Sequence, residues 1–140
     1  MGNKRIKTTL LYSGTLHNDW TYSGFHSRCD GKLPTISLFQ IKNGDCIGGF
    51  TKAPWSSHVE YNSDPYATVF NATRSRHFSS QNTGNDIWCD ADFGPCFSGG
   101  GSDLAAHAAP FNAENKCWSW ANKPGFKIPL DENGKNQLTN

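Results

Sequence analysis

Five cysteines are the side chains in this sequence with the widest chemical repertoire: Cys29, Cys46, Cys89, Cys96 and Cys117. Their number is odd and no two are spaced as CxxC, whereas a secreted disulfide framework normally uses an even number. The pattern favours reduced thiols, several of them buried as small apolar side chains. A redox-active cysteine needs an exposed thiol with a depressed pKa. Cys29 has a cation on one side, Arg28, and an anion on the other, Asp30, so a cysteine-based redox protein is retained only as an alternative.

Histidines and glycines supply the other candidates for chemistry. His26 with the cysteines contains suitable zinc ligands, but the short paired spacings of structural zinc sites are missing. His26 near Cys29, and His107 near Asp103, could each pair a base with a partner, yet no nucleophile elbow or cysteine-enzyme signature surrounds them. The glycine-rich run 99–102 lacks the lysine of a phosphate-binding loop, which favours a tight turn. We therefore expect no enzyme activity, no catalytic residue, no metal and no cofactor.

Composition narrows the classes of partner. Thirteen Lys and Arg nearly balance twelve Asp and Glu, so no nucleic acid or anionic membrane is expected as a partner. No apolar run approaches the roughly 20 residues that span a bilayer, and no signal-like leader opens the chain. These features predict one domain without membrane insertion in an intracellular setting, either cytoplasmic or part of an organellar or cytoskeletal complex.

A hairpin is the strongest structural pattern, and it must position whatever site the chain carries. Residues 35–41 alternate apolar and polar side chains, Asn43-Gly44 predicts a tight turn, and residues 45–51 predict the returning strand. Gly48-Gly49 inside that strand predicts that another backbone or a bulky ring comes close, with Phe50 and Trp55 as candidates for the ring. Residues 23–28 ahead of the hairpin predict one or two helical turns capped by Ser23.

Further strands are predicted at residues 8–13, 66–71, 105–109, 116–120 and 126–129. Residues 56–65 read as a polar turn, and Arg74, Arg76 and His77 as a small basic cluster. The pattern predicts a mainly β protein, a two-sheet antiparallel β-sandwich with short peripheral helices. Residues 1–7 are expected to form an arm, 8–129 the domain and 130–140 a polar tail.

The ordered landmarks resemble the TLDc domain of oxidation-resistance proteins. The resemblance is carried by Leu10-Leu11-Tyr12, Phe25-His26-Ser27-Arg28-Cys29-Asp30-Gly31-Lys32, Pro34-Thr35, Gly48-Gly49-Phe50-Thr51, Pro54-Trp55-Ser56-Ser57, and more loosely Ser63-Asp64-Pro65, Phe93-Gly94-Pro95 and Gly101-Ser102-Asp103-Leu104. It implies a two-sheet sandwich and links the chain to oxidative-stress resistance and to regulation of the vacuolar proton-pumping ATPase (V-ATPase). No catalytic mechanism is established for the family.

Three departures from the family pattern qualify the resemblance. A helical region usually precedes the Leu-Leu-Tyr strand, a Ser-Arg-Asp-Gly motif often follows it, and a further strand normally closes the domain. In this sequence only a few residues precede Leu10-Leu11-Tyr12, residues 13–19 differ from the Ser-Arg-Asp-Gly motif, and the sequence stops at Asn140 before a further strand. We therefore expect a larger assembly to complete the sheet.

The resulting prediction is a non-enzymatic TLDc-like protein-interaction module, a subunit or regulator of a larger assembly, with the vacuolar proton ATPase as the partner that the resemblance implies. The alternative is a structural component of another large complex, such as a cytoskeletal assembly. Loops on a rigid sandwich carry binding function. The residues predicted to contact a partner are Trp55, Ser56, Ser57, His58, Arg74, Arg76, Phe97 and Asp103.

Overall fold

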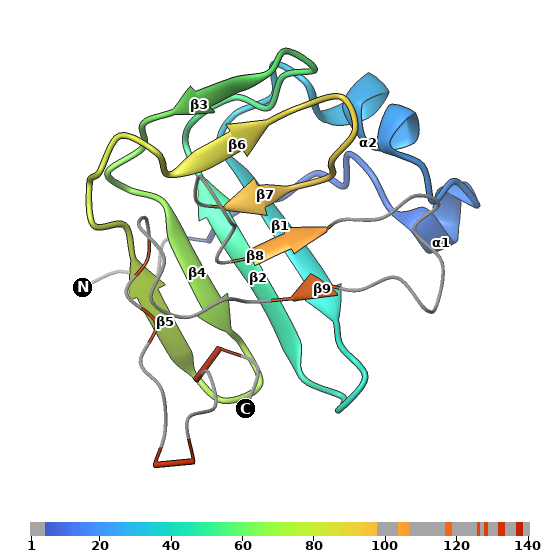
Figure 1. Cartoon of the computed structure of the whole chain (residues 1–140). Coiled ribbons are helices and arrows are strands. Elements are labelled where there is room, and N and C mark those ends of the chain that lie inside the picture. Colours follow the sequence, from blue (N-terminus) through green and yellow to red (C-terminus); the bar gives the residue numbers. More distant parts are fainter. Residues whose placement is uncertain are drawn as a thin grey trace.

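Two stacked antiparallel sheets form the body of the molecule (Figure 1). The computed structural model describes residues 5–97, 104–106, 117–118, 126, 128, 132–133 and 137–138. The first sheet has the order β1-β2-β4-β5 and contains β1 (Thr35–Gln40), β2 (Cys46–Thr51), β4 (Thr68–Asn71) and β5 (Arg76–Ser79). The second has the order β3-β6-β7-β8-β9 and contains β3 (Glu60–Asn62), β6 (Ile87–Cys89), β7 (Cys96–Phe97), β8 (Leu104–Ala106) and β9 (Cys117–Trp118). With the short helices α1 (Gly14–His17) and α2 (Tyr22–Cys29) at the periphery, the predicted sandwich is confirmed.

The central hairpin forms as its sequence predicts. β1 and β2 pair antiparallel from Thr35 opposite Thr51 to Gln40 opposite Cys46. Gly44 closes the turn with a positive φ of 91°, a conformation that favours glycine, and its N–H donates to the Ile41 carbonyl at 2.9 Å. Local turn chemistry and side-chain alternation are therefore enough to predict this element from its own sequence.

The glycine pair of β2 does receive aromatic rings, but not the predicted ones. A Cβ added to Gly49 would lie 2.5 Å and 2.6 Å from the two Cε atoms of Phe97, a residue of the second sheet. A Cβ on Gly48 would meet first the backbone oxygen of Ser37 on the paired strand β1, and then Cζ of Phe70 on the other neighbouring strand, β4, at 2.9 Å. The prediction of Phe50 and Trp55 was wrong because a strand's nearest rings come from paired strands and the facing sheet, not from its own sequence neighbours.

A chain of edge-to-face aromatic contacts joins α2 to both sheets through the core. Trp55 lies between Phe25 of α2 and Phe97 of β7, with ring centroids 5.8 Å and 5.5 Å away. Phe97 in turn contacts Phe126 at 6.4 Å. The Trp55 indole N–H donates to the Thr35 hydroxyl at 2.9 Å, which satisfies its buried polar atom.

A buried carboxylate holds the end of β2 against the segment that leads into β4. Asp64, only 3% exposed, accepts hydrogen bonds from the Thr51 hydroxyl at 2.8 Å and from the backbone N–H groups of Lys52 at 2.6 Å and Tyr66 at 3.0 Å. Burial raises the pKa of Asp64, but these hydrogen bonds outweigh it and leave the pKa below its usual value. The charged form of Asp64 therefore stabilises this corner.

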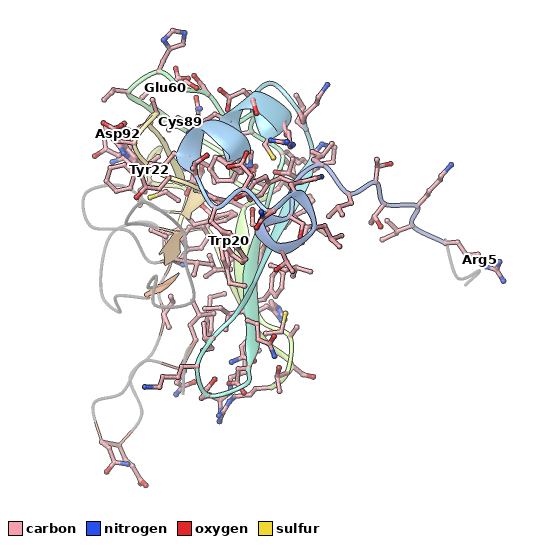
Figure 2. The ribbon with its side chains drawn as sticks, turned by 90° about the vertical axis from the view of Figure 1, so that its right-hand side faces the viewer. Arg5, Trp20, Tyr22, Glu60, Cys89 and Asp92 are labelled. Carbon is pink, nitrogen blue, oxygen red and sulfur yellow. The ribbon has the colours of Figure 1, made fainter. Side chains whose placement is uncertain are left out.

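Several predicted boundaries were wrong for tertiary reasons. Residues 8–13 form no strand, and residues 5–10 are an exposed arm that carries Arg5 away from the body (Figure 2). Leu11 and Tyr12 do pack on the core, which explains why the segment is apolar. Helix α2 begins at Tyr22 with Thr21, not Ser23, as its cap, because the Thr21 hydroxyl accepts the Gly24 N–H at 3.0 Å.

The other differences concern polar strands and the last residues. Residues 56–65 contain β3 and residues 74–77 the start of β5, although both are polar in sequence, since pairing with β6 and β4 decides their structure. Within the predicted polar tail, Leu138 is fully buried, and the Asn71 side-chain amide donates to its carbonyl at 2.8 Å. Phe126 forms an antiparallel bridge with Ser80, the residue that directly follows β5.

Candidate functional site

The carboxylate of Asp30, directly after α2, is the centre of a polar cluster at one end of the sandwich. Its Oδ1 lies 2.6 Å from Nδ1 of His26, one helical turn earlier, and its Oδ2 accepts the Ser57 hydroxyl at 2.7 Å. The second ring nitrogen of His26, Nε2, lies 3.0 Å from the Asp90 carbonyl and 2.9 Å from the Phe93 carbonyl. We call these five residues the Asp30 clamp.

The clamp ties together three segments that are distant in sequence. Carbonyl oxygens only accept, so Nε2 of His26 carries a proton and donates to the 90–93 turn. Three oxygen atoms surround this ring, which is only 7% exposed. The Gly31 N–H also donates to the Trp55 carbonyl at 2.9 Å. The loop after Trp55 is thus held by side-chain and backbone bonds.

The order of the three clamp side chains does not suit nucleophilic catalysis. A hydrolytic triad places histidine between the serine and the carboxylate, so that the imidazole can take the serine proton. Here Asp30 lies between His26 and Ser57, and Nε2 of His26 faces two backbone carbonyls. No imidazole nitrogen reaches the Ser57 hydroxyl through these contacts. The hydrogen bonds of the clamp instead hold the loop that contains Ser57.

A shallow, open hollow of about 320 Å³ lies over the clamp. It is lined by Ser23, His26, Ser27, Asp30, Ser57 and Ala91. Glu60 and Asp92 are exposed, and Figure 2 shows both at the same end of the molecule as α2. The surface around the hollow is therefore rich in hydroxyl and carboxylate groups.

The predicted loop residues divide into core and surface. Trp55 is 2% exposed and Phe97 is fully buried, so the structure places both side chains in the core. Ser57 and His58 are exposed, and the half-buried Ser56 accepts the His58 N–H on its hydroxyl at 3.0 Å. Only these three of the four loop residues remain available to a partner.

Asp103, the remaining residue predicted from the second glycine-rich loop, lies outside the described residues.

The two predicted arginines lie at the opposite end of the sandwich, around the turn between β4 and β5 (Figure 1). Arg74 donates from Nε to the Asp45 carboxylate at 2.5 Å, and Arg76 donates to the Gln137 carbonyl at 3.2 Å. Hydrogen bonds from Asn71 and then from Arg74 hold the pKa of Asp45 below its usual value. Both arginines thus support local structure, and they do not join the 56–58 loop in one site.

Asp30 itself was missed as a site residue in the sequence. The available signal is its spacing four residues after His26 across the end of a predicted helix, where the two side chains face one another. Ser57 was predicted, but nothing in the sequence pairs it with a residue 27 positions earlier.

Two of the cysteines lie in environments that disfavour the thiolate. Burial, assisted by the Asp30 charge, raises the pKa of Cys29 to about 11. Burial likewise raises the pKa of Cys89. Neither thiol has the depressed pKa that a redox sensor uses.

The part of the chain that the structure describes contains neither a cluster of metal ligands nor a membrane-spanning helix. There, no three His, Cys, Asp or Glu side chains gather closely enough to hold a metal ion. No helix among the same residues has the length and hydropathy to cross a bilayer.

Comparison with known proteins adds one match. A family model described as TLDc domain matches residues 2–138, nearly the whole chain. No curated protein and no solved structure matches the chain. The match covers the first-half motif and also the loosely similar second half, including the buried Leu138.

Proposed function

This chain belongs to the TLDc domain family, and from that premise we propose that it acts as a non-enzymatic protein-interaction module in a larger assembly. The observation that carries the proposal is the family match over residues 2–138. It is supported by the Asp30 clamp, whose hydrogen bonds hold an exposed loop instead of assembling a base beside a nucleophile.

The loop carrying Ser57 and His58 is the part of this surface best suited to contact a partner. Both residues are exposed, while the clamp and the backbone bond from Gly31 to Trp55 fix the chain on either side. A loop that is already ordered loses little conformational entropy when it binds. Binding residues concentrate on such loops, held by a rigid scaffold.

The charge around the loop indicates what kind of partner surface fits it. Asp30 is 29% exposed, and Glu60 and Asp92 are exposed at the same end. These carboxylates would complement a basic partner surface, which steers encounter and fixes orientation more than it adds affinity. We therefore propose a protein partner that presents lysine or arginine to this end of the sandwich.

The finer proposal is that the assembly is the vacuolar proton ATPase, which family resemblance alone supports. Affinity capture of the intact chain from a cell extract, with quantitative mass spectrometry, tests it. Recovery of the ATPase subunits in fixed proportion is the expected result. Fixed proportions of cytoskeletal or other subunits would replace the ATPase with a structural role, and recovery of the chain alone would contradict the interaction module.

Charge reversal tests the surface itself. The double variant Glu60→Lys and Asp92→Lys should reduce the recovered partner about tenfold, because two attractions become repulsions at exposed positions. Glu132→Lys, which changes an exposed glutamate outside this surface, is the matched control. Equal recovery with the double variant and the control would remove this surface from the proposal.

A further inference from the structure

Strand β1 forms an edge of the first sheet, and in the part of the chain that the structure describes it is the longest edge strand. Among the described strands it pairs only with β2, through all six of its residues. The edge strands β3, β5 and β9 have three, four and two residues. An edge strand presents a row of backbone N–H and C=O groups to which another extended chain can bind. Figure 2 views the molecule from the side on which β1 lies in Figure 1.

β1 also lacks the features that usually block edge pairing. Natural edges are protected by charged side chains, prolines or bulges. The sequence of β1, TISLFQ, contains no charge and no proline, and its register with β2 is continuous. In contrast, β5 contains Arg76 and His77, and Phe126 bridges the residue that follows it.

The face of the sheet beside this edge is apolar and exposed. Ile36 and Leu38 are 54% and 62% exposed, whereas Thr35, the first residue of the strand, is buried on the opposite face. Their cross-strand partners extend the strip, since Ile36 lies opposite the half-buried Phe50 and Leu38 lies opposite Gly48. The Phe70 ring covers Gly48 from the next strand. An added strand could place apolar side chains beside Ile36 and Leu38.

Charge at the two ends of β1 selects the occupant. Lys32 precedes the strand and Lys42 follows it, and both are exposed. Antiparallel pairing of two copies about a two-fold axis through Ser37 would set Lys32 of one copy opposite Lys42 of the other, and like charges directly opposite are destabilising. The chain's own arm is no better suited, because it carries Arg5 and Lys7. An incoming strand with acidic ends would pair with both lysines.

We propose that the β1 edge binds an extended segment of a partner protein, with apolar residues alternating along its centre and acidic residues at both ends. The segment adds a fifth strand to the first sheet. Its apolar side chains pack beside Ile36 and Leu38, and its carboxylates meet Lys32 and Lys42. The four residues of this surface, Ile36, Leu38, Lys32 and Lys42, belong neither to the Asp30 clamp nor to the 56–58 loop.

The test uses a fluorescent synthetic peptide of alternating valine and threonine with two glutamates at each end. Fluorescence anisotropy should show saturable binding to the intact chain, weakened about tenfold or more by Leu38→Lys and by the double variant Lys32→Glu and Lys42→Glu. Val59→Lys, at a residue 69% exposed just before β3, is the matched control and should bind normally. Backbone amides of β1 that face away from β2 should exchange hydrogen at least tenfold more slowly when the peptide is bound.

Three results would overturn the proposal. The first is no binding, or protection of amides elsewhere than in β1. The second is equal binding of a peptide with lysines in place of the glutamates, which would exclude charge selection. The third is a concentration-dependent dimer of the free chain with β1 protected, which would make a second copy the occupant. Circular dichroism of each variant separates loss of binding from loss of fold.

Discussion

Gly49 in the middle of β2 gives the sharpest stability prediction, because two opposing effects act at one position. Replacing glycine by alanine within a strand normally raises the free energy of unfolding by about 0.5–1 kcal/mol, because alanine gives the unfolded chain less conformational freedom. Here the new methyl group would lie 2.5 Å and 2.6 Å from ring carbons of Phe97. Carbon atoms rest about 3.5–4 Å apart, so ring and methyl must separate by about 1 Å.

The Phe97 ring lies in a packed environment that resists this movement. It is fully buried and contacts the rings of Trp55 and Phe126 at centroid distances of 5.5 Å and 6.4 Å. Overpacking a filled core costs about 1–3 kcal/mol. Because the gain from replacing glycine offsets part of this cost, Gly49→Ala should lower the free energy of unfolding by up to about 2.5 kcal/mol. Urea unfolding, followed by fluorescence, should show a lower midpoint with an unchanged slope.

A compensating variant makes the reasoning refutable. Phe97→Leu alone should destabilise the chain by removing buried ring atoms. In the double variant the alanine methyl occupies part of the vacated space, so the two costs should sum to less than their separate values, with a coupling of about 0.5–3 kcal/mol. A higher stability for Gly49→Ala, or strict additivity in the double variant, would contradict the close contact between Gly49 and the Phe97 ring.

Three further predictions follow from groups described above. The pKa of Asp64 in the folded chain lies below that of an unfolded aspartate, so its contribution to stability is present above the unfolded pKa and is lost as the pH falls through the folded pKa. The urea midpoint of unfolding should therefore change less on acidification in the Asp64→Asn variant than in the parent chain. Asp30→Ala should cost about 1–3 kcal/mol of stability, because two hydrogen bonds to a partly exposed carboxylate are lost. The same variant should speed hydrogen exchange of the backbone amides in residues 56–58, and unchanged exchange there would mean that the clamp does not hold the loop. The thiol of Cys29, with a pKa of about 11, should react with iodoacetamide much more slowly at pH 8 than the thiol of the half-buried Cys46. Peptide mass spectrometry measures the two labelling rates, and equal rates would contradict the argument that burial suppresses the Cys29 thiolate.

The parts of the fold that were predictable from sequence are those with local causes. The β1–β2 hairpin follows from Asn43-Gly44 and the alternation around it, so both strands and the turn appear where expected. The glycine pair correctly indicated close-lying rings, but the identity of the ring over Gly49 depends on the facing sheet. Leu10 illustrates the opposite error, because an apolar triplet predicted a strand where the structure has an exposed arm.

The candidate site was harder to predict because its contacts are long-range. Ser57 meets Asp30 across 27 positions, and His26 meets the carbonyl of Asp90 across 64. A single sequence contains no signal that pairs such residues. In the structure Ser57 and His58 are exposed, whereas Trp55 is buried because its ring fills the space between α2 and the second sheet.

The position of Trp55 gives the molecule an internal optical reporter. Its indole contacts a ring from α2 and a ring from β7, and it donates a hydrogen bond to β1, so one chromophore senses three separate elements. An indole held edge-on to two other rings in a dry interior has an asymmetric environment, and the near-ultraviolet circular dichroism of aromatic groups is lost when tertiary packing loosens. A variant that keeps Trp55 and replaces the other tryptophans would therefore report, in a single signal, whether the helix and the two sheets close together or one after another during folding.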